Sequence, residues 1–293
     1  MDIVYRFDPL QPLVHHQVRT NEQALERLSQ GNCRFAELVE RMHQINDGAQ
    51  APPPFIVPIN PVKLGVPVLS GLEPAHAPFA LVLGCADARV PIEHVFDCSA
   101  NDLFVVRVAG NVLGLECLGS VDYAACNLNA SLRSVIVLGH TGCGAVTAAV
   151  DIYNSPADFG DIAFSHAVRS LLDRIMLAVR GSARALNRHL GPQAQQMPEY
   201  REWLITTAVY MNAAVTAWDL QREVNAVTTQ PLPVSFGVYD MGKMRVSSLP
   251  LLCRADVDAT SAFAAAPSSS QDFVEIAERI ASRLIGDRSS VRI

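Results

Sequence analysis

The sequence predicts an α/β fold: a four-stranded parallel sheet extended by one antiparallel strand, with helices on both faces and an N-terminal helical arm. Three observations predict it. The apolar run at 80–83 is typical of a buried strand. From residue 78 onward, such runs alternate with stretches of helical pattern, as in a parallel sheet with crossover helices. The turn at 239–242 is too short for a crossover, so the strands that it joins run antiparallel.

The chain before this core is expected to form the arm. Asn21 can cap a helix over 21–45, where apolar residues recur at helical spacing and Gly31 is a weak point. Residues 46–78 are rich in proline and predict an extended, irregular segment. Its apolar residues indicate that it lies over a surface. We therefore divide the chain into an arm with a proline-rich segment (1–75), an α/β domain that holds the site (76–250) and a C-terminal extension with a helix (251–293).

The elements of the core follow in order. Parallel strands are expected at 79–83, 103–108, 134–138 and 233–238, and the antiparallel strand at 243–249. Helices are expected at 91–97, 115–129, 144–152, 161–190 and 197–226. The Ala/Ser-rich stretch 256–269 is expected to be loose, before a final helix at 271–286.

Reactive side chains follow two of the predicted strands. The first strand leads into Cys85, Asp87 and Arg89 at alternate positions, and the third leads into His140 and Cys143. In open α/β sheets, sites assemble at the carboxyl ends of the strands, where the strand order reverses. Both loops border one crevice if the first and third strands are neighbours, with the second outside the first and the fourth outside the third.

Two cysteines and one histidine are a donor set of catalytic zinc sites, which leaves one coordination position open. Asp87 can accept a hydrogen bond from a zinc-bound hydroxide, and Arg89 can keep Asp87 ionised. Elsewhere, an Asp-x-Arg pair is often only a structural ion pair. The amide of Gly144 opens a predicted helix, where an anion binds well.

Composition limits the possible classes of protein. The 293 residues are 49% hydrophobic with a net charge of −6, so neither nucleic acid nor an anionic membrane is an expected partner. No apolar run is long enough to span a bilayer, and the N-terminus lacks the pattern of a secretory signal. Seven cysteines without an export signal indicate a reducing compartment, and we expect a cytoplasmic protein.

The motifs resemble those of the β-class carbonic anhydrases. The core from 78 to 150 is similar to that family throughout, in "CADARVP", "DLFVVRVAGN", "LGSVDYA" and "VIVLGHTGCGAV". The resemblance implies one zinc ion per chain and hydration of CO2 to bicarbonate and a proton through zinc-bound hydroxide. It also implies a dimer or tetramer, with the N-terminal helix packed on the partner. Carried over by position, the zinc ligands are Cys85, His140 and Cys143, and the catalytic pair is Asp87 and Arg89.

The resemblance also suggests substrate-binding positions. Phe104 and Tyr123 match residues that line a narrow apolar pocket, and His76 stands where many members carry a substrate-contacting glutamine. These side chains could equally be core aromatics and a surface histidine. Gly144 is the fourth candidate. In some members the aspartate equivalent to Asp87 becomes a fourth zinc ligand at low pH, and the sequence does not decide between the two arrangements.

Three other functions stay open at this point. The same site could hydrolyse COS or CS2, because the motifs do not separate these substrates. A zinc-binding regulatory protein without catalysis is a second alternative, but a structural zinc site favours a fourth protein ligand and has no use for Asp87 and Arg89. Thiol redox chemistry is weakly supported, because the chain has no C-x-x-C motif.

Overall fold

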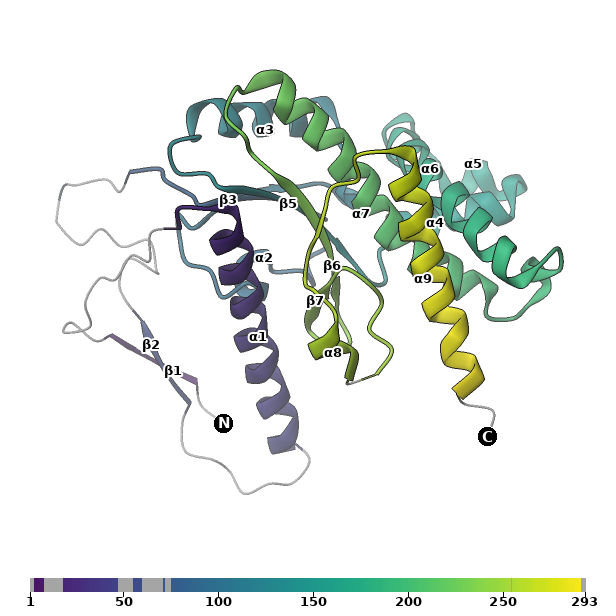
Figure 1. Cartoon of the computed structure of the whole chain (residues 1–293), viewed down its shortest axis with the longest axis horizontal. Coiled ribbons are helices and arrows are strands. Elements are labelled where there is room, and N and C mark those ends of the chain that lie inside the picture. The colour runs from purple at the N-terminus through teal and green to yellow at the C-terminus, as the bar shows by residue number, and fades with distance from the viewer. Residues whose placement is uncertain are drawn as a thin grey trace.

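The computed structural model describes residues 3–7, 18–46, 55–59, 71, 75–253 and 255–290. Its main sheet has the strand order β4-β3-β5-β6-β7, and β8 also pairs with β6 (Figure 1). The strands are β3 (Ala80–Gly84), β4 (Leu103–Arg107), β5 (Ser134–His140), β6 (Val234–Asp240), β7 (Arg245–Ser247) and β8 (Ala264–Ala265). The four strands β4, β3, β5 and β6 are parallel, and β7 is antiparallel to β6, so the predicted fold class is confirmed. The strand order is also the one that a single crevice for both loops requires.

The edge beyond β6 differs from the prediction. β7 is shorter than expected and pairs only with the last three residues of β6. The first half of β6 pairs instead with β8, which lies in the stretch 256–269 that was expected to be loose. That stretch also contains the short helix α8 (Ala255–Ala259). Gly237 makes the approach possible, because a Cβ there would lie 2.6 Å from the carbonyl oxygen of Ala262.

Helices cover both faces of the sheet. Leu81 and Leu83 of β3 face a core built with α3, α4, α6, α7 and α9, whereas Ala80 and Val82 face a second core built with α1 and α2. This explains the continuous apolar run of β3, since a strand buried on both faces has no polar side. The helices are α1 (Asn21–Asn46), α2 (Ile92–Val95), α3 (Leu115–Asn127), α4 (Gly144–Asn154), α5 (Phe159–Ile162), α6 (His166–Leu190), α7 (Tyr200–Val227) and α9 (Ser270–Ser290).

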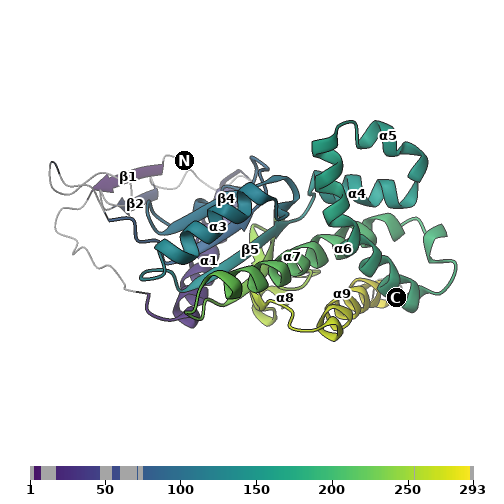
Figure 2. The same cartoon turned by 90° about the horizontal axis from the view of Figure 1, so that it is seen from above.

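The segment between α4 and α7 forms a helical group at one end of the sheet. Figure 2 shows α4, α5 and α6 together at that end, with α9 alongside. α6 packs against α4, α7 and α9, and α9 also packs against α7. Arg188 of α6 pairs with Glu278 of α9 at 2.8 Å. No helix of the described chain is long and apolar enough to cross a membrane.

The arm helix α1 docks on its own chain at Gly31 and Asn32. A Cβ on Gly31 would lie 1.9 Å from the carbonyl oxygen of Phe96, so only glycine allows α1 to cross the end of α2. Asn32, 2% exposed, donates to the carbonyls of Val95 and Met244, and its own Oδ1 accepts from the amide of Val246. Gly31, which was expected to weaken the helix, therefore lies where α1 packs against α2 and, through Asn32, against β7.

Two further details of the arm differ from expectation. Thr20, and not Asn21, caps α1, because its Oγ1 accepts from the amide of Gln23 at 3.3 Å. Residues 3–7 and 55–59 form a separate parallel pair of strands, β1 (Ile3–Phe7) and β2 (Phe55–Ile59), where the sequence predicted only an extended segment. The remainder of the proline-rich segment, 47–54, 60–70 and 72–74, lies outside the described residues.

Candidate active site

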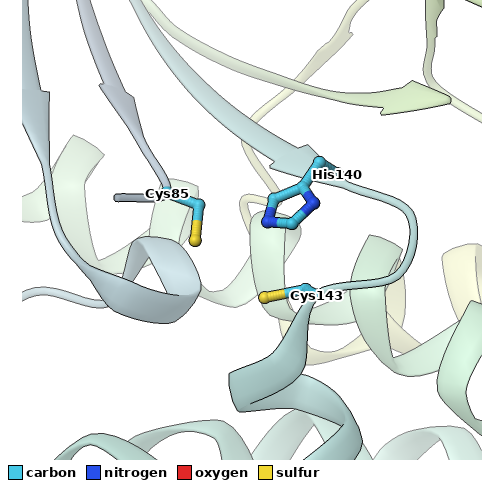
Figure 3. Close-up of side chains that lie close together, drawn as sticks. All are labelled: Cys85, His140 and Cys143. Atoms are coloured by element: carbon cyan, nitrogen blue, oxygen red, sulfur yellow. The ribbon is translucent and has the colours of Figure 1, made fainter. Parts of the chain in front are cut away.

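Three predicted metal ligands meet at the carboxyl ends of β3 and β5. Cys85 follows β3, His140 is the last residue of β5, and Cys143 directly precedes α4. Their side chains point toward one another (Figure 3), and their ligand atoms all lie within 4.8 Å of one another. The three residues are between 1% and 5% exposed. Among the described residues, this is the one such cluster of histidine, cysteine or carboxylate groups.

The local sequence explains this convergence. β3 and β5 are adjacent and parallel, with Gly84 opposite Leu138, so Cys85 and His140 leave the sheet at the same edge. Beyond His140 the chain must turn back to bring Cys143 beside it. Gly142 makes that turn at a φ of +66°, a left-handed conformation that favours glycine. The amide of Met241 donates to Thr141 Oγ1 at 3.0 Å and ties the loop to the end of β6.

The histidine is oriented as a metal ligand. Its Nδ1 lies 3.0 Å from the carbonyl oxygen of Thr141, which can only accept, so Nδ1 carries the proton. The lone pair is then on Nε2, which is buried and has no hydrogen-bond partner among the described residues. A buried polar atom without a partner is costly, and a bound metal ion would satisfy it.

The two thiols also fit a cation between them. A hydrogen bond from Cys143 lowers the pKa of the Cys85 thiol well below its usual value. The same pairing, together with burial, raises the pKa of Cys143 far above its usual value. One of the two sulfurs therefore ionises readily, and the second ionises only when a positive charge replaces the shared proton. Two thiolates and one imidazole are a donor set that suits zinc.

Asp87 and Arg89 form a two-point ion pair beside the three ligands. Arg89 Nη2 lies 2.6 Å from Asp87 Oδ2, and Arg89 Nε lies 3.0 Å from Oδ1, which also accepts from the Arg89 amide at 2.9 Å. These bonds hold the pKa of the Asp87 carboxyl well below its usual range. Asp87 Oδ2 is also 3.9 Å from His140 Nε2, so an ionised oxygen faces the metal-binding atoms.

Two arginines link the loops around the site. Arg89 Nη2 donates to the carbonyl of Gly142 at 3.3 Å and so connects the two predicted motifs. Arg107, at the end of β4, donates to the carbonyls of Cys85 at 3.0 Å and Asp87 at 2.5 Å. Arg107 lies outside both sequence motifs and was not predicted as part of the site. The feature that could have identified Arg107 is its charge at the end of an otherwise apolar strand, which lies next to the strand that leads into Cys85.

The predicted substrate residues His76, Phe104 and Tyr123 are brought together with one another, in a row apart from the metal ligands. The rings of His76 and Phe104 stack at 5.9 Å, and those of Phe104 and Tyr123 lie at 6.5 Å. Phe104 pairs with Leu81, four residues before Cys85, which corresponds to roughly 13 Å along the strand. These three side chains therefore do not line the metal site of their own chain.

Asn101 adopts a φ of +68°, and its side chain holds the loop before β3 by bonds to Ala75 and Ala77. Gly144 directly follows Cys143 as the first residue of α4, and a Cβ placed on it would meet nothing within 4 Å. The remaining five cysteines are free thiols outside the cluster, and three of them are exposed.

Comparisons with known proteins agree with this geometry. A sequence model of the family described as carbonic anhydrase matches residues 80–239, more than half of the chain. Carbonic anhydrase 2 of Mycobacterium tuberculosis is 47% identical over 85 residues, which are 29% of this chain and 40% of that relative. The carbonic anhydrase of Mycolicibacterium smegmatis is 40% identical over 118 residues, 40% of this chain and 53% of that relative. The chain thus spans about half or less of the length of these relatives.

Among solved structures, a Coccomyxa beta-carbonic anhydrase in complex with acetazolamide aligns with a TM-score of 0.45 and 22% identity, over 63% of this chain and 78% of the other. The sheet with a buried Cys-His-Cys set at the carboxyl ends of its strands defines an α/β protein with a candidate zinc centre. With the family match over 80–239, the class becomes specific: the chain belongs to the carbonic anhydrase family, in its β class.

Proposed function

We propose that the protein is a zinc-dependent carbonic anhydrase that catalyses the reversible hydration of CO2 to bicarbonate and a proton. One zinc ion per chain would be held by Cys85, His140 and Cys143. The observation that carries the proposal is the meeting of these three buried donors within 4.8 Å, beside a carboxylate that Arg89 keeps ionised. Membership of the carbonic anhydrase family supports it independently.

The chain supplies three ligands, and zinc bound there would provide a Lewis acid that makes a water molecule acidic near neutral pH. Asp87 has the complementary task. Because its pKa is held low, it is an acceptor only, and it can take a hydrogen bond from the attacking water and orient that water toward CO2. Arg89 fixes the carboxylate through two parallel bonds. We assign binding of the bicarbonate anion to the Gly144 amide, because this residue begins α4 and helix N-termini favour anions.

The position of Asp87 supports an orienting role over a role as fourth ligand. Both of its carboxylate oxygens are occupied by Arg89, and Oδ1 accepts two bonds from it. Moving Asp87 onto a metal ion would break at least one of these charge-assisted bonds. Activity confined to alkaline pH would instead indicate the closed arrangement, in which Asp87 is a ligand.

A second copy of the chain is the proposed partner. In the part of the chain that the structure describes, β4 is the outermost strand on its side of the sheet, and the row His76, Phe104 and Tyr123 lies along it. Tyr123 is 52% exposed, and Leu115 on the same helix is 80% exposed. Exposed apolar side chains beside an exposed sheet edge favour association. In a dimer or tetramer this row would be available to complete a substrate pocket with the partner.

A reducing, cytoplasmic location also stays a prediction, in line with seven free thiols.

Stopped-flow CO2 hydration, with zinc measured on the same sample, tests the proposal. We expect activity with about one zinc ion per chain and parallel loss of both on chelation. COS and CS2 are assayed beside CO2, because hydrolysis of either one without CO2 hydration would support the hydrolase alternative. A sample loaded with zinc but inactive on all three substrates would support the regulatory alternative and overturn the proposal.

A further inference from the structure

Asn212 is a buried polar residue in an otherwise apolar stretch of α7. It is 1% exposed and is flanked by the buried Met211 and Ala213. Its side-chain amide donates to the carbonyl oxygen of Gly110 at 2.8 Å, 102 residues away in the sequence. The amide of Gly110 in turn donates to Cys85 Sγ at 3.4 Å. One residue, Gly110, thus joins Asn212 to a predicted metal ligand.

Gly110 lies in a tight turn directly after β4, and only glycine fits there. Its φ is +70°, and a Cβ on it would lie 2.9 Å from Cδ1 of Ile175 and 3.0 Å from Cβ of Ala145. The turn is closed by a bond from the Asn111 amide to the Val108 carbonyl at 3.0 Å. It is therefore enclosed between α4 and α6.

The carbonyl of Gly110 needs a donor in this position. The residue is buried, and a buried carbonyl without a partner would weaken the turn by the cost of its desolvation. Asn212 supplies that donor from α7, a 28-residue helix that packs on β5 and β6. This bond anchors the turn on the side of the Gly110 carbonyl, and the adjacent peptide of the same turn carries the amide that donates to Cys85.

We infer that Asn212 is a positioning residue for the metal centre, acting through Gly110 on Cys85. The inference rests on the proposed zinc site. Hydrogen bonds to a thiolate ligand set its orientation and its electron donation, and loss of such outer partners typically weakens metal binding by roughly 10-fold to 100-fold. Asn212 touches neither the ligands nor the proposed substrate, so its effect must be measured on the metal.

The test compares two buried polar residues of the same helix. Asn212→Leu removes the donor at similar size, and Asn212→Ala is measured in parallel in case the leucine prevents folding. The matched control is Thr207→Val. Thr207 is fully buried, but its hydroxyl donates to Trp203 within the helix at 2.8 Å and has no link to the site. Zinc affinity is measured by competition with a chelator, and the thiolate-to-metal absorption band is recorded with cobalt(II).

We expect the Asn212 variants to bind zinc about 10-fold more weakly and to shift the cobalt band. Thr207→Val should lower the unfolding temperature while its zinc affinity stays within about twofold of the parent. Folded Asn212 variants with parental affinity and an unchanged cobalt band would overturn the inference and leave the proposed function intact. A parent protein that binds neither metal would instead overturn the proposed function.

Discussion

Cys85 and Asp87 stand two residues apart, yet the fold gives them different surroundings. Cys85 is turned inward, where the Gly110 amide and Cys143 contact its sulfur. Asp87 is turned toward the loops, where Arg89 binds both of its oxygens. Residues two apart in a strand share a face, so the separation arises because the chain has left β3 and turns at Asp87, whose carbonyl accepts from the Val90 amide at 3.1 Å. At the scale of the residue, the C-x-D-x-R motif therefore places a proposed metal ligand and an ionised acceptor on the same short loop.

Asp87→Asn tests the role of the acceptor. The variant keeps the size of the side chain but loses the charge that Arg89 holds, so we expect CO2 hydration to fall about 100-fold while zinc content is unchanged. Stopped-flow assays and metal analysis on one sample measure both. Asp97→Asn is the control, because Asp97 also pairs with an arginine, Arg34, at 2.6 Å, but lies outside the site. Loss of zinc from Asp87→Asn would show that Asp87 is itself a ligand.

At the scale of the element, α1 depends on a single close approach. The carbonyl of Phe96 occupies the space of a side chain at Gly31, and Asn32 is tied to three backbone groups of α2 and the β7 region. The sequence suggested Gly31 only as a weakness in a helix. The reason for it could not be predicted, because the contacting carbonyl is 65 residues away and belongs to a different element.

Gly31→Ala should separate α1 from the sheet. An added methyl group 1.9 Å from a backbone oxygen forces a shift, and we expect a loss of about 2 kcal/mol or more in the free energy of unfolding. Gly181→Ala on α6 is the control. A Cβ there would make an ordinary contact at 3.8 Å, so this change should leave stability equal or slightly higher. Urea unfolding measures both, and an equal response of the two variants would contradict the account of α1.

The C-terminal region carries a pH-sensitive contact. Amide donors at Cys253 and Leu252, together with Arg283 of α9, lower the pKa of Asp256 to about 2 from 3.8. A depressed carboxyl pKa stabilises the fold above the unfolded pKa, and this stability is lost as pH falls from about 4 to about 2. Asp256→Asn should therefore show a smaller drop in the free energy of unfolding between pH 5 and pH 2.5. An unchanged drop would contradict this assignment.

The sequence predicted the parallel strands and the donor motifs at their carboxyl ends, because apolar runs and motif spacing are local signals. The convergence of the donors depended on the strand order, which the sequence supplied only as a condition. The sequence did not predict β8 or Arg107. β8 is only two residues long and depends on the edge that β7 leaves open. Arg107 depends on the register that sets it opposite Gly84. Asn212 left no local signal either, since its partner Gly110 is distant in the chain. β8, Arg107 and Asn212 could not be predicted because their positions matter only through tertiary contacts.

At the scale of the whole molecule, the aromatic row lies along the β4 edge of the sheet, apart from the proposed metal site of the same chain. A second copy packed along β4 would cover Tyr123 and Leu115, and would bring His76 and Phe104 toward a neighbouring site. The proposed assembly thus links oligomeric state to substrate binding.

Tyr123→Arg tests this link. A charge at this half-exposed position should disfavour association and shift the protein from a dimer or tetramer toward the monomer, measured by light scattering after size-exclusion chromatography. We expect CO2 hydration to fall with it. Leu177→Arg is the control, since Leu177 is 65% exposed on α6, away from the β4 edge. If both variants keep the parental mass, the β4 edge is not the interface.

We propose that Cys85, His140 and Cys143 hold a catalytic zinc ion. The variant Cys143→Ala provides the direct test of this proposal. The variant removes one of three ligands, and Cys33→Ala, which changes an exposed thiol on α1, is the control. Zinc content and the rate of CO2 hydration are measured on the same samples. We predict that Cys143→Ala loses both together while Cys33→Ala keeps both. Full CO2 hydration by a zinc-free Cys143→Ala protein would contradict the account.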